Sequence, residues 1–353
     1  SDLHPEGDLD AFVSAQTKSA DPLTCSNGEP GSEINGVQNL GEGPHVEGWY
    51  FRAVDPETAE SWVLIIGYWT DGTGRANGFV ELIHWPTGQV RKEFVPDLDL
   101  ETLKAQVGAL DLWIGGINIT NTAVAGDILT ETDEWIELDW QIDNCAHWGG
   151  PTDERNRWTM GWAARLPALP IYWHVHHLKA SMSGWIFMNG ERRQLSNLVL
   201  HQEKNWGRAF PKSWIWLQNN HFPGRPDIAF AAAGGPILNL PLSPHGYMVG
   251  LRWRDQFIDW KSQDLDHITD VRVEYDADTE LVRWSLTAEN RRYRIEVEVD
   301  APRGELIGID VPTDSGLVQR AFEHLGARMM LRLYQRQGRR DWQEVDRVES
   351  YNA

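Results

Sequence analysis

The stretch that runs from His201 to Asn220, HQEKNWGRAFPKSWIWLQNN, carries the strongest structural signal in the chain. After the break at Phe210-Pro211 its residues alternate with the period of a β-strand. One strand face then holds Trp214, Trp216, Gln218 and Asn220, and the other holds Ile215, Leu217 and Asn219. Two indoles and two amides on one face are typical of a half-polar cavity wall, because a face packed into a core would be aliphatic.

An acidic residue precedes this strand. If residues 201–207 are also extended, Glu203 and Asn205 share a face and Lys204 points to the opposite one. Two interpretations stay open: a buried acid held by Lys204 in a structural ion pair, or an acid in a Trp-lined cavity. In a cavity, desolvation would raise the pKa of Glu203, since burial penalises the charged form, and Glu203 could then donate a proton near neutral pH.

Antiparallel β patterns continue in both directions from this stretch. Short apolar runs recur at roughly 8–12-residue spacing, and turn residues separate them. Asn189-Gly190 is a two-residue hairpin turn between strands expected at 180–188 and 191–200. Long parallel βαβ units are absent from the pattern, which excludes a dinucleotide-binding fold. One helix is predicted at residues 315–325.

The chain divides into three expected segments. Residues 1–43 form an irregular, acidic N-terminal arm, with a short helix near residues 9–18. Residues 44–210 and 211–353 each suit an up-and-down barrel that encloses one small apolar ligand. The predicted fold class is therefore all-β, with two consecutive lipocalin-like antiparallel β-barrels and one or two short helices.

Composition limits the partners and the compartment. The net charge of −20 argues against nucleic acid and against an electrostatic anchor on anionic lipid. The 19 tryptophans suit a Trp-rich pocket, although packing as ordinary β-core must account for most of them. No apolar run approaches the ~18 residues that span a bilayer, and no signal peptide is visible. Because the chain starts at Ser1 without Met, a leader or tag can already have been removed. We expect a cytoplasmic protein or one peripheral to a membrane, of open oligomeric state.

Histidines and cysteines raise the question of a metal. His174, His176 and His177 form a run, with Cys145 and His147 upstream. No second ligand pair with zinc spacing accompanies them, and histidines also suit a wet barrel mouth, so we expect no metal. Cys25 and Cys145 could form a disulfide, which the sequence does not decide.

A third candidate lies at Glu47-Gly48-Trp49-Tyr50-Phe51, where Glu47 and Trp49 share a strand face. Either this strand contributes to a site, or it closes a barrel and its glutamate is simply hydrogen-bonded.

Several of these segments together resemble the tocopherol cyclase family. The segments are Glu47 to Phe51, Tyr172-Trp173-His174-Val175-His176, Glu203-Lys204-Asn205-Trp206-Gly207 and the alternating strand from Trp214 to Asn220. The resemblance extends from about Pro44 to the C-terminus and implies two lipocalin-like barrels, shared distantly with carotenoid 1,2-hydratases. In those relatives an acidic residue stands where Glu203 falls. Residues 318–326 and the acidic arm depart from the family pattern.

The resemblance implies an intramolecular reaction on a prenylated hydroquinone or a related apolar polyene. An acid protonates the alkene, and the phenol oxygen closes a ring on the tertiary cation, without a cofactor or a metal. The catalytic residues would be Glu203 as proton donor, Asn205 and His176. The residues that bind substrate would be Glu47, Trp49, Tyr50, Trp173, Trp206, Trp214, Trp216, Gln218 and Asn220. Another cyclase or hydratase on the same fold and a non-catalytic carrier of apolar ligands remain as alternatives.

Overall fold

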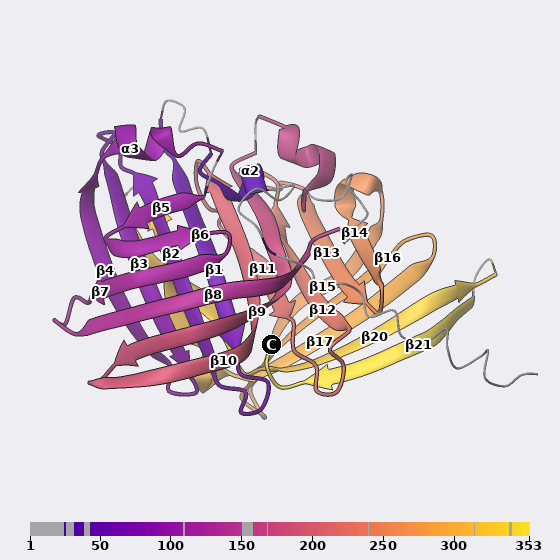
Figure 1. The fold of residues 1–353 in the computed structure, drawn as a ribbon. Coiled ribbons are helices and arrows are strands. Elements are labelled where there is room, and N and C mark those ends of the chain that lie inside the picture. The colour runs from indigo at the N-terminus through magenta and orange to yellow at the C-terminus, as the bar shows by residue number, and fades with distance from the viewer. Residues whose placement is uncertain are drawn as a thin grey trace, which may run out of the picture.

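A computed structural model describes residues 25, 32–38, 43–108, 110–149, 158–167, 169–238, 240–313, 315–338 and 341–353. Almost all regular structure in these residues is antiparallel β-strand (Figure 1). The prediction of an all-β chain is confirmed. The helix expected near residues 9–18 lies outside the described residues. Among the described residues, no helix has the length and apolar character needed to cross a membrane.

The first half of the chain forms one ten-stranded sheet. Its strands are β1 (Val46–Val54), β2 (Ser61–Thr70), β3 (Ala76–Trp85), β4 (Gln89–Leu98), β5 (Asp111–Ile114), β6 (Gly116–Thr120), β7 (Ala123–Leu129), β8 (Trp135–His147), β9 (Ile171–Met188) and β10 (Glu191–Gly207). They are ordered β4-β3-β2-β1-β10-β9-β8-β7-β6-β5, and β5 returns to lie against β2 and β3. The sheet therefore curls almost into a barrel, around an apolar core that includes Trp49, Trp62 and Trp140.

Two short helices and a disulfide accompany this sheet. The helices are α2 (Ser32–Asn35) and α3 (Leu100–Ala105), and Asp99 caps α3 by accepting a hydrogen bond from the backbone N–H of Glu101. Cys25 and Cys145 are joined as a disulfide, with their Cα atoms 5.4 Å apart. The bond links the N-terminal arm to the end of β8.

The second half forms two further antiparallel sheets around a second core. The four-stranded sheet holds β11 (Ile215–Asn219), β12 (Ile228–Pro236), β13 (His245–Trp253) and β14 (Gln256–Lys261). The five-stranded sheet holds β15 (His267–Asp276), β16 (Leu281–Glu289), β17 (Tyr293–Pro302), β20 (Arg328–Gln337) and β21 (Asp341–Ser350). The 3₁₀ helices are η2 (Gly161–Arg165), η3 (Ser262–Asp264) and η4 (Arg303–Glu305). The domain boundary at 210/211 stays a prediction.

The helix predicted at residues 315–325 is wrong. The segment is instead the second strand of a hairpin made of β18 (Ile307–Thr313) and β19 (Gly316–Glu323), in which Val311 pairs with Val318. The apolar residues of β19 happen to be spaced as in a helix. Burial of the neighbouring strand against another part of the molecule outweighs that weak local preference.

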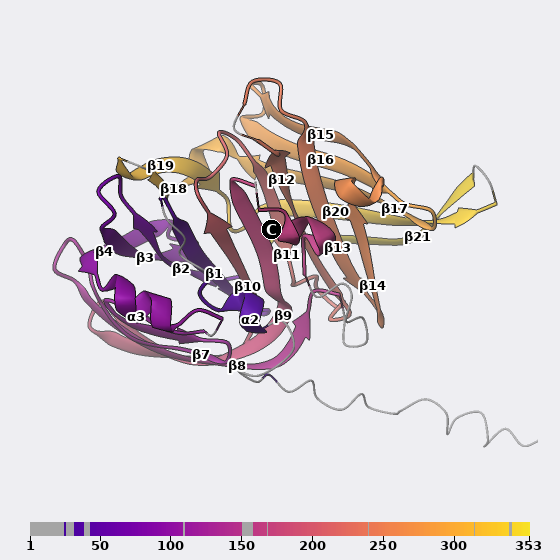
Figure 2. The ribbon, with the colours of Figure 1, turned by 90° about the horizontal axis from the view of Figure 1, so that it is seen from above.

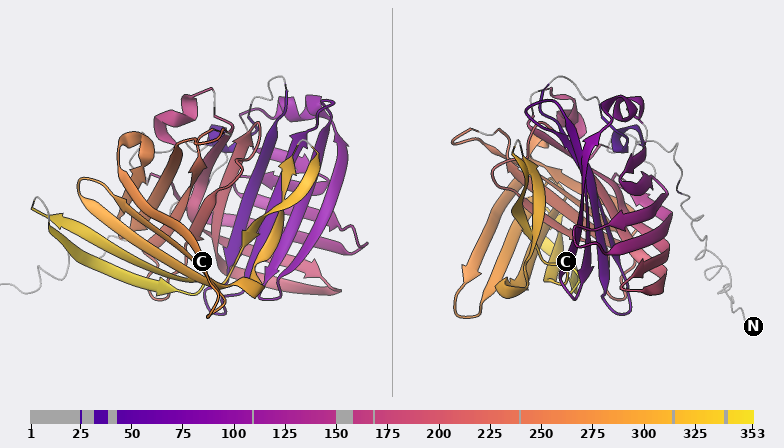
Figure 3. Two further views of the ribbon diagram at one scale, coloured as in Figure 1. Left: turned by 180° about the vertical axis from the view of Figure 1, so that it is seen from behind. Right: turned by 90° about the vertical axis from the view of Figure 1, so that its left-hand side faces the viewer.

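This hairpin crosses back to the first half of the molecule. Figures 2 and 3 show it beside β2, β3 and β4, away from the other C-terminal strands. Ile309 packs in a cluster with Val63 and Ile83 of the first sheet. Lys92 Nζ lies 2.6 Å from Asp310 Oδ2, which adds an ion pair at the same contact.

Candidate active site

A cavity of about 440 Å³ lies where the two halves of the chain meet. Its walls come from β1, β9 and β10 of the first sheet, from β11, β12 and β13, from the hairpin β18–β19, and from residues around η2. The sequence analysis expected the ligand inside a barrel. The structure corrects this, because apolar side chains fill the interiors of both halves. Many aromatic residues line the cavity, namely Tyr50, Phe79, Trp162, Tyr172, Trp173, Phe210, Trp214, Trp216 and Tyr247.

Strand alternation decides which side chains reach this cavity. Strands β1 and β10 pair so that Tyr50 lies opposite Glu203 and Gly48 lies opposite Asn205. These four residues line the cavity. Lys204 is directed to the other face, as predicted, where its ammonium lies over the ring of Trp49 at 4.9 Å from the centroid.

Lys204 forms its ion pair with Glu47 and not with Glu203. The Nζ atom lies 2.5 Å from Glu47 Oε1, and both side chains are fully buried. Tyr68 donates a hydrogen bond of 2.5 Å to Glu47 Oε2. Although burial opposes the charge, Lys204 and His45 lower the pKa of Glu47 below its ordinary value. Glu47 is thus a structural carboxylate, and the interpretation of Glu203 as the partner of Lys204 is wrong.

Glu203 is 4% exposed and borders the cavity. Its Oε2 atom accepts a hydrogen bond of 2.9 Å from Trp216 Nε1 and lies 2.9 Å from His201 Nε2. Both contacts are made by N–H donors when His201 carries its proton on Nε2. A carboxylate oxygen that is held in place by such donors can act as a proton acceptor.

A second acid, Glu323, reaches the cavity from the hairpin and was missed by the sequence analysis. Tyr50 donates a hydrogen bond of 3.1 Å to its Oε2 atom. Burial raises the pKa of Glu323 to about 7, and the nearby charge of Glu203 adds to the rise. Near neutral pH, Glu323 therefore holds a proton in a large fraction of molecules. The sequence analysis missed Glu323 because it predicted a helix at residues 315–325, whereas these residues form a strand that brings Glu323 to the cavity.

The other predicted site residues fall into three groups, two of which border the cavity. Trp173 and Trp214 line the cavity, and Asn205 donates a hydrogen bond of 3.1 Å to the backbone carbonyl of Tyr172. Glu47 and Trp49 border it through their strand, but the carboxylate and the indole face the first core.

Four predicted residues do not line the cavity, namely His176, Trp206, Gln218 and Asn220. Gln218 shares its strand face with Trp216, but β11 extends past the cavity, and its Oε1 accepts a hydrogen bond of 2.7 Å from Arg52. The ring of Trp206 stacks on Tyr172, with centroids 5.3 Å apart. His176 is directed towards β8, and its ring centroid lies 5.3 Å from that of His147.

The cavity thus combines Glu323, whose pKa is raised to about 7 by burial, with Glu203, whose Oε2 atom accepts a hydrogen bond from Trp216. Two carboxyl groups in one cavity can serve as general acid and general base. The aromatic faces around them can stabilise a cation. Groups of three neighbouring side chains that could hold a metal occur among the described residues, but none of their members lines this cavity.

Comparison with known proteins gives a family match. A family model described as tocopherol cyclase-like matches residues 103–353. The chloroplastic tocopherol cyclase of Zea mays is 28% identical over 166 residues, which are 45% of this chain and 33% of that protein. A probable chloroplastic tocopherol cyclase of Oryza sativa subsp. japonica is 29% identical over 157 residues, or 43% of this chain and 31% of that protein. The matches thus cover about a third of the length of these curated relatives.

A solved structure from Nitrosomonas europaea that is named for AttH aligns with 86% of this chain and 91% of its own. The identity is 11% and the TM-score is 0.39, which is too low to support an argument.

Proposed function

This chain belongs to the tocopherol cyclase-like family, and from that premise we propose that it is a cyclase that closes a ring in an apolar, prenylated hydroquinone or a related polyene. The reaction is an intramolecular addition that begins with protonation of an alkene. The observation that carries the proposal is the presence of Glu203 and Glu323 in one cavity that many aromatic residues line.

Ring closure of this kind needs an acid that keeps its proton at working pH. Glu323 meets the requirement, because burial raises its pKa to about 7. It also needs shelter for a tertiary cation. The rings of Tyr50 and Trp216 meet edge to face with centroids 5.1 Å apart, and both line the cavity beside the two acids. Such rings stabilise a desolvated cation by about 2 kcal/mol.

We assign the proton transfers as follows. The carboxyl group of Glu323 transfers its proton to one alkene carbon, and the tertiary cation forms at the other. The phenol oxygen adds to the cation, and the Glu203 carboxylate accepts the phenol proton. His201 Nε2 lies 2.9 Å from Glu203 Oε2 and holds the carboxyl group in position. The substrate and product are isomers, and the two carboxyl groups return to their starting states by exchanging protons with solvent. This assignment replaces Glu203 as the donor.

The same chemistry requires that water be kept away from the cation, because water would trap it as an alcohol. The cavity volume is of the size that holds drug-like ligands. Much of an isoprenoid chain could lie along the apolar wall formed by Ile65, Phe79 and Leu169.

The test is incubation of the purified protein with prenylated hydroquinones in D₂O, followed by mass spectrometry. A cyclase gives an isomer of the substrate that carries one deuterium on carbon from the solvent. A hydratase would instead give a product with the elements of water added. Binding without any conversion would mean that the chain is a carrier. Glu323→Gln is expected to remove the deuterium transfer, and a fully active Glu323→Gln variant would refute the assigned donor.

A further inference from the structure

A group of three histidines lies outside the cavity, on β8 and β9. In the ladder between β9 and β10, Val175 pairs with Glu203 and His177 pairs with Gln202, so that His176 is an extra residue in a β-bulge. A bulge disrupts the strict alternation of side chains, which allows two adjacent residues to lie towards the same neighbour. That neighbour is His147, which pairs with His177 across β8 and β9.

The three imidazoles converge closely. His147, His176 and His177 each offer a ring nitrogen, and these nitrogens all lie within 4.8 Å of one another. The ring centroids are 5.3 Å apart for His147 and His176, 5.2 Å for His147 and His177, and 4.3 Å for His176 and His177. The cluster thus has the size of a first coordination shell.

One histidine makes a hydrogen bond of the kind that metal ligands usually make. His147 Nδ1 donates a hydrogen bond of 2.8 Å to the backbone carbonyl of His176. The proton on Nδ1 leaves the lone pair on Nε2, and a metal-bound histidine is typically held by such a bond from its other nitrogen. His176 and His177 are 2% and 0% exposed, whereas His147 is only half-buried, so an ion could approach from the His147 side.

We propose that His147, His176 and His177 bind one divalent transition-metal ion of the zinc class. Neutral imidazoles suit Zn²⁺, Co²⁺, Ni²⁺ and Cu²⁺, and three protein ligands leave a fourth position for water. None of the three histidines lines the cavity, so the ion is assigned to holding β8 and β9 together and not to ring closure. The inference does not depend on the proposed function.

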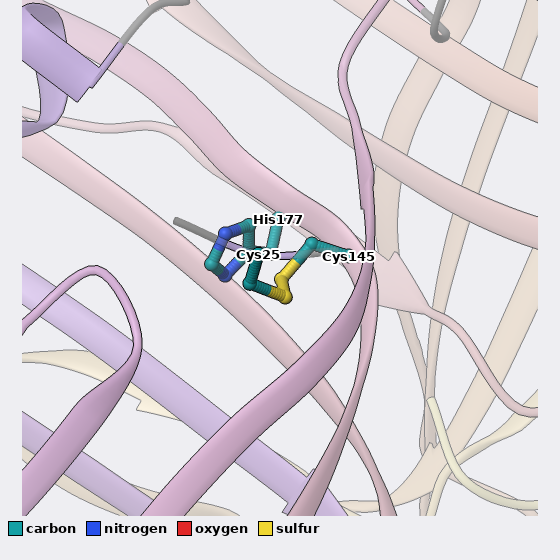
Figure 4. A group of neighbouring side chains, drawn as sticks. All are labelled: Cys25, Cys145 and His177. Atoms are coloured by element: carbon teal, nitrogen blue, oxygen red, sulfur yellow. A yellow bond between two sulfur atoms is a disulfide. The ribbon is translucent and has the colours of Figure 1, made fainter. Parts of the chain in front are cut away.

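The disulfide lies beside this group. Figure 4 shows the ring of His177 next to the Cys25–Cys145 bond, and ligand atoms of these three residues also lie within 4.8 Å of one another. Sulfur atoms joined in a disulfide are not thiolates, which are the form that binds metals. In the oxidised protein the ligands are therefore the imidazoles. The ion and the disulfide would together fasten β8, β9 and the N-terminal arm at one place.

The experiment uses this chain in its non-reduced form after treatment with a chelator. Co²⁺ is added and the visible absorption is recorded, and Zn²⁺ is then added in competition. We expect one Co²⁺ per chain, displacement by Zn²⁺, and a higher melting temperature with metal than without it. His147→Gln and His176→Gln should each weaken binding by at least about tenfold, which is the smallest loss expected even for an outer-shell partner.

His174→Gln is the matched control. His174 belongs to the same histidine run, and its ring centroid is 5.9 Å from that of His176, but it is not a member of the group. This variant should bind Co²⁺ within about twofold of the parent, a smaller change than that at an outer-shell partner. Circular dichroism of each variant excludes misfolding as the cause of a loss.

Three results would overturn the proposal. One is the absence of saturable binding to the folded parent protein. Another is an equal loss of affinity in the control and in the His147 and His176 variants. The third is binding that appears only after reduction by a dithiol and disappears in Cys145→Ser, which would assign the site to thiolates.

Discussion

Replacement of Glu323 by glutamine tests the central electrostatic argument most directly. The pKa of Glu323 is about 7, compared with an ordinary value of 4.5. At pH 7 roughly half of the Glu323 side chains are then neutral, whereas an ordinary glutamate would be neutral in about 0.3% of molecules. At pH 7 burial thus makes the neutral form of Glu323, the proposed proton donor, about 150 times more abundant. Activity that needs the neutral form should be full below pH 7 and fall about tenfold for each pH unit above it.

The same shift makes stability depend on pH. In the folded protein Glu323 keeps a proton that the unfolded chain releases above pH 4.5. Its contribution is therefore fully present below pH 4.5 and is lost as pH rises to about 7. The total loss is about 3 kcal/mol in the free energy of unfolding. The Glu323→Gln variant has no such loss. Between pH 4.5 and pH 8 its free energy of unfolding should therefore decrease by about 3 kcal/mol less than that of the parent protein.

Difference infrared spectroscopy measures the neutral carboxyl group without any substrate. We expect a signal that titrates near pH 7 and is missing in Glu323→Gln. Two neighbours should move the midpoint in opposite directions. Tyr50→Phe should raise it, because the Tyr50 hydroxyl favours the charged form of Glu323. Glu203→Gln should lower it, because the charge of Glu203 opposes a second one.

The refuting outcomes are specific. A carboxyl signal with a midpoint near 4.5, or one that survives in Glu323→Gln, would mean that Glu323 is not the neutral acid. Equal shifts in Tyr50→Phe and Glu203→Gln would contradict the arrangement of the three groups. Urea unfolding at both pH values checks the stability argument independently.

Four further predictions concern other parts of the molecule. Trp216→Phe removes the N–H donor to Glu203 and should lower kcat about tenfold, because a charge-assisted hydrogen bond contributes about 1.5–3 kcal/mol; an unchanged kcat would contradict this prediction. Lys204→Met leaves the buried carboxylate of Glu47 without its cation and should destabilise the protein by about 3–5 kcal/mol in urea unfolding, whereas a loss below about 1 kcal/mol would argue that the pair is dispensable. Cys25→Ser opens a bond between residues 120 apart in the sequence and should lower the free energy of unfolding by up to about 5 kcal/mol, and a parental melting temperature would show that the bond does not form. Leu240 is 65% exposed, lies close in sequence to the cavity residue Ile237, and is expected to contact lipid. Leu240→Asp should therefore reduce the amount of protein that sediments with zwitterionic vesicles. Equal sedimentation of the variant and the parent would argue against peripheral membrane association.

Alternation made part of the site predictable from the sequence. The pattern of residues 214–217 placed Trp214 and Trp216 on one face, and the structure has both on the cavity wall, with Ile215 and Leu217 in the second core. The same reasoning directed Lys204 away from Glu203. Local periodicity suffices in these cases because each strand lies between two environments of opposite character.

The rest depends on contacts between distant parts of the chain. Glu323 reaches the cavity only because the hairpin β18–β19 folds back onto the first sheet. The local sequence around residue 323 does not predict that contact. The position of the cavity is likewise a result of how the two halves meet. The resemblance to a known family implied that His176 belongs to the site, but His176 is an extra residue in a β-bulge, which directs its side chain towards β8.

The hairpin β18–β19 makes both halves of the chain contribute an acid to the same cavity. Glu203 belongs to the ten-stranded sheet and Glu323 to the C-terminal half, so neither half contains both of the acids to which the proposed proton transfers are assigned. The two acids are therefore brought into one cavity only when the two halves pack together. A chimera that joins this C-terminal half to the N-terminal sheet of another protein would carry Glu323 together with one wall of the cavity. We therefore expect such a chimera to change its substrate preference as well.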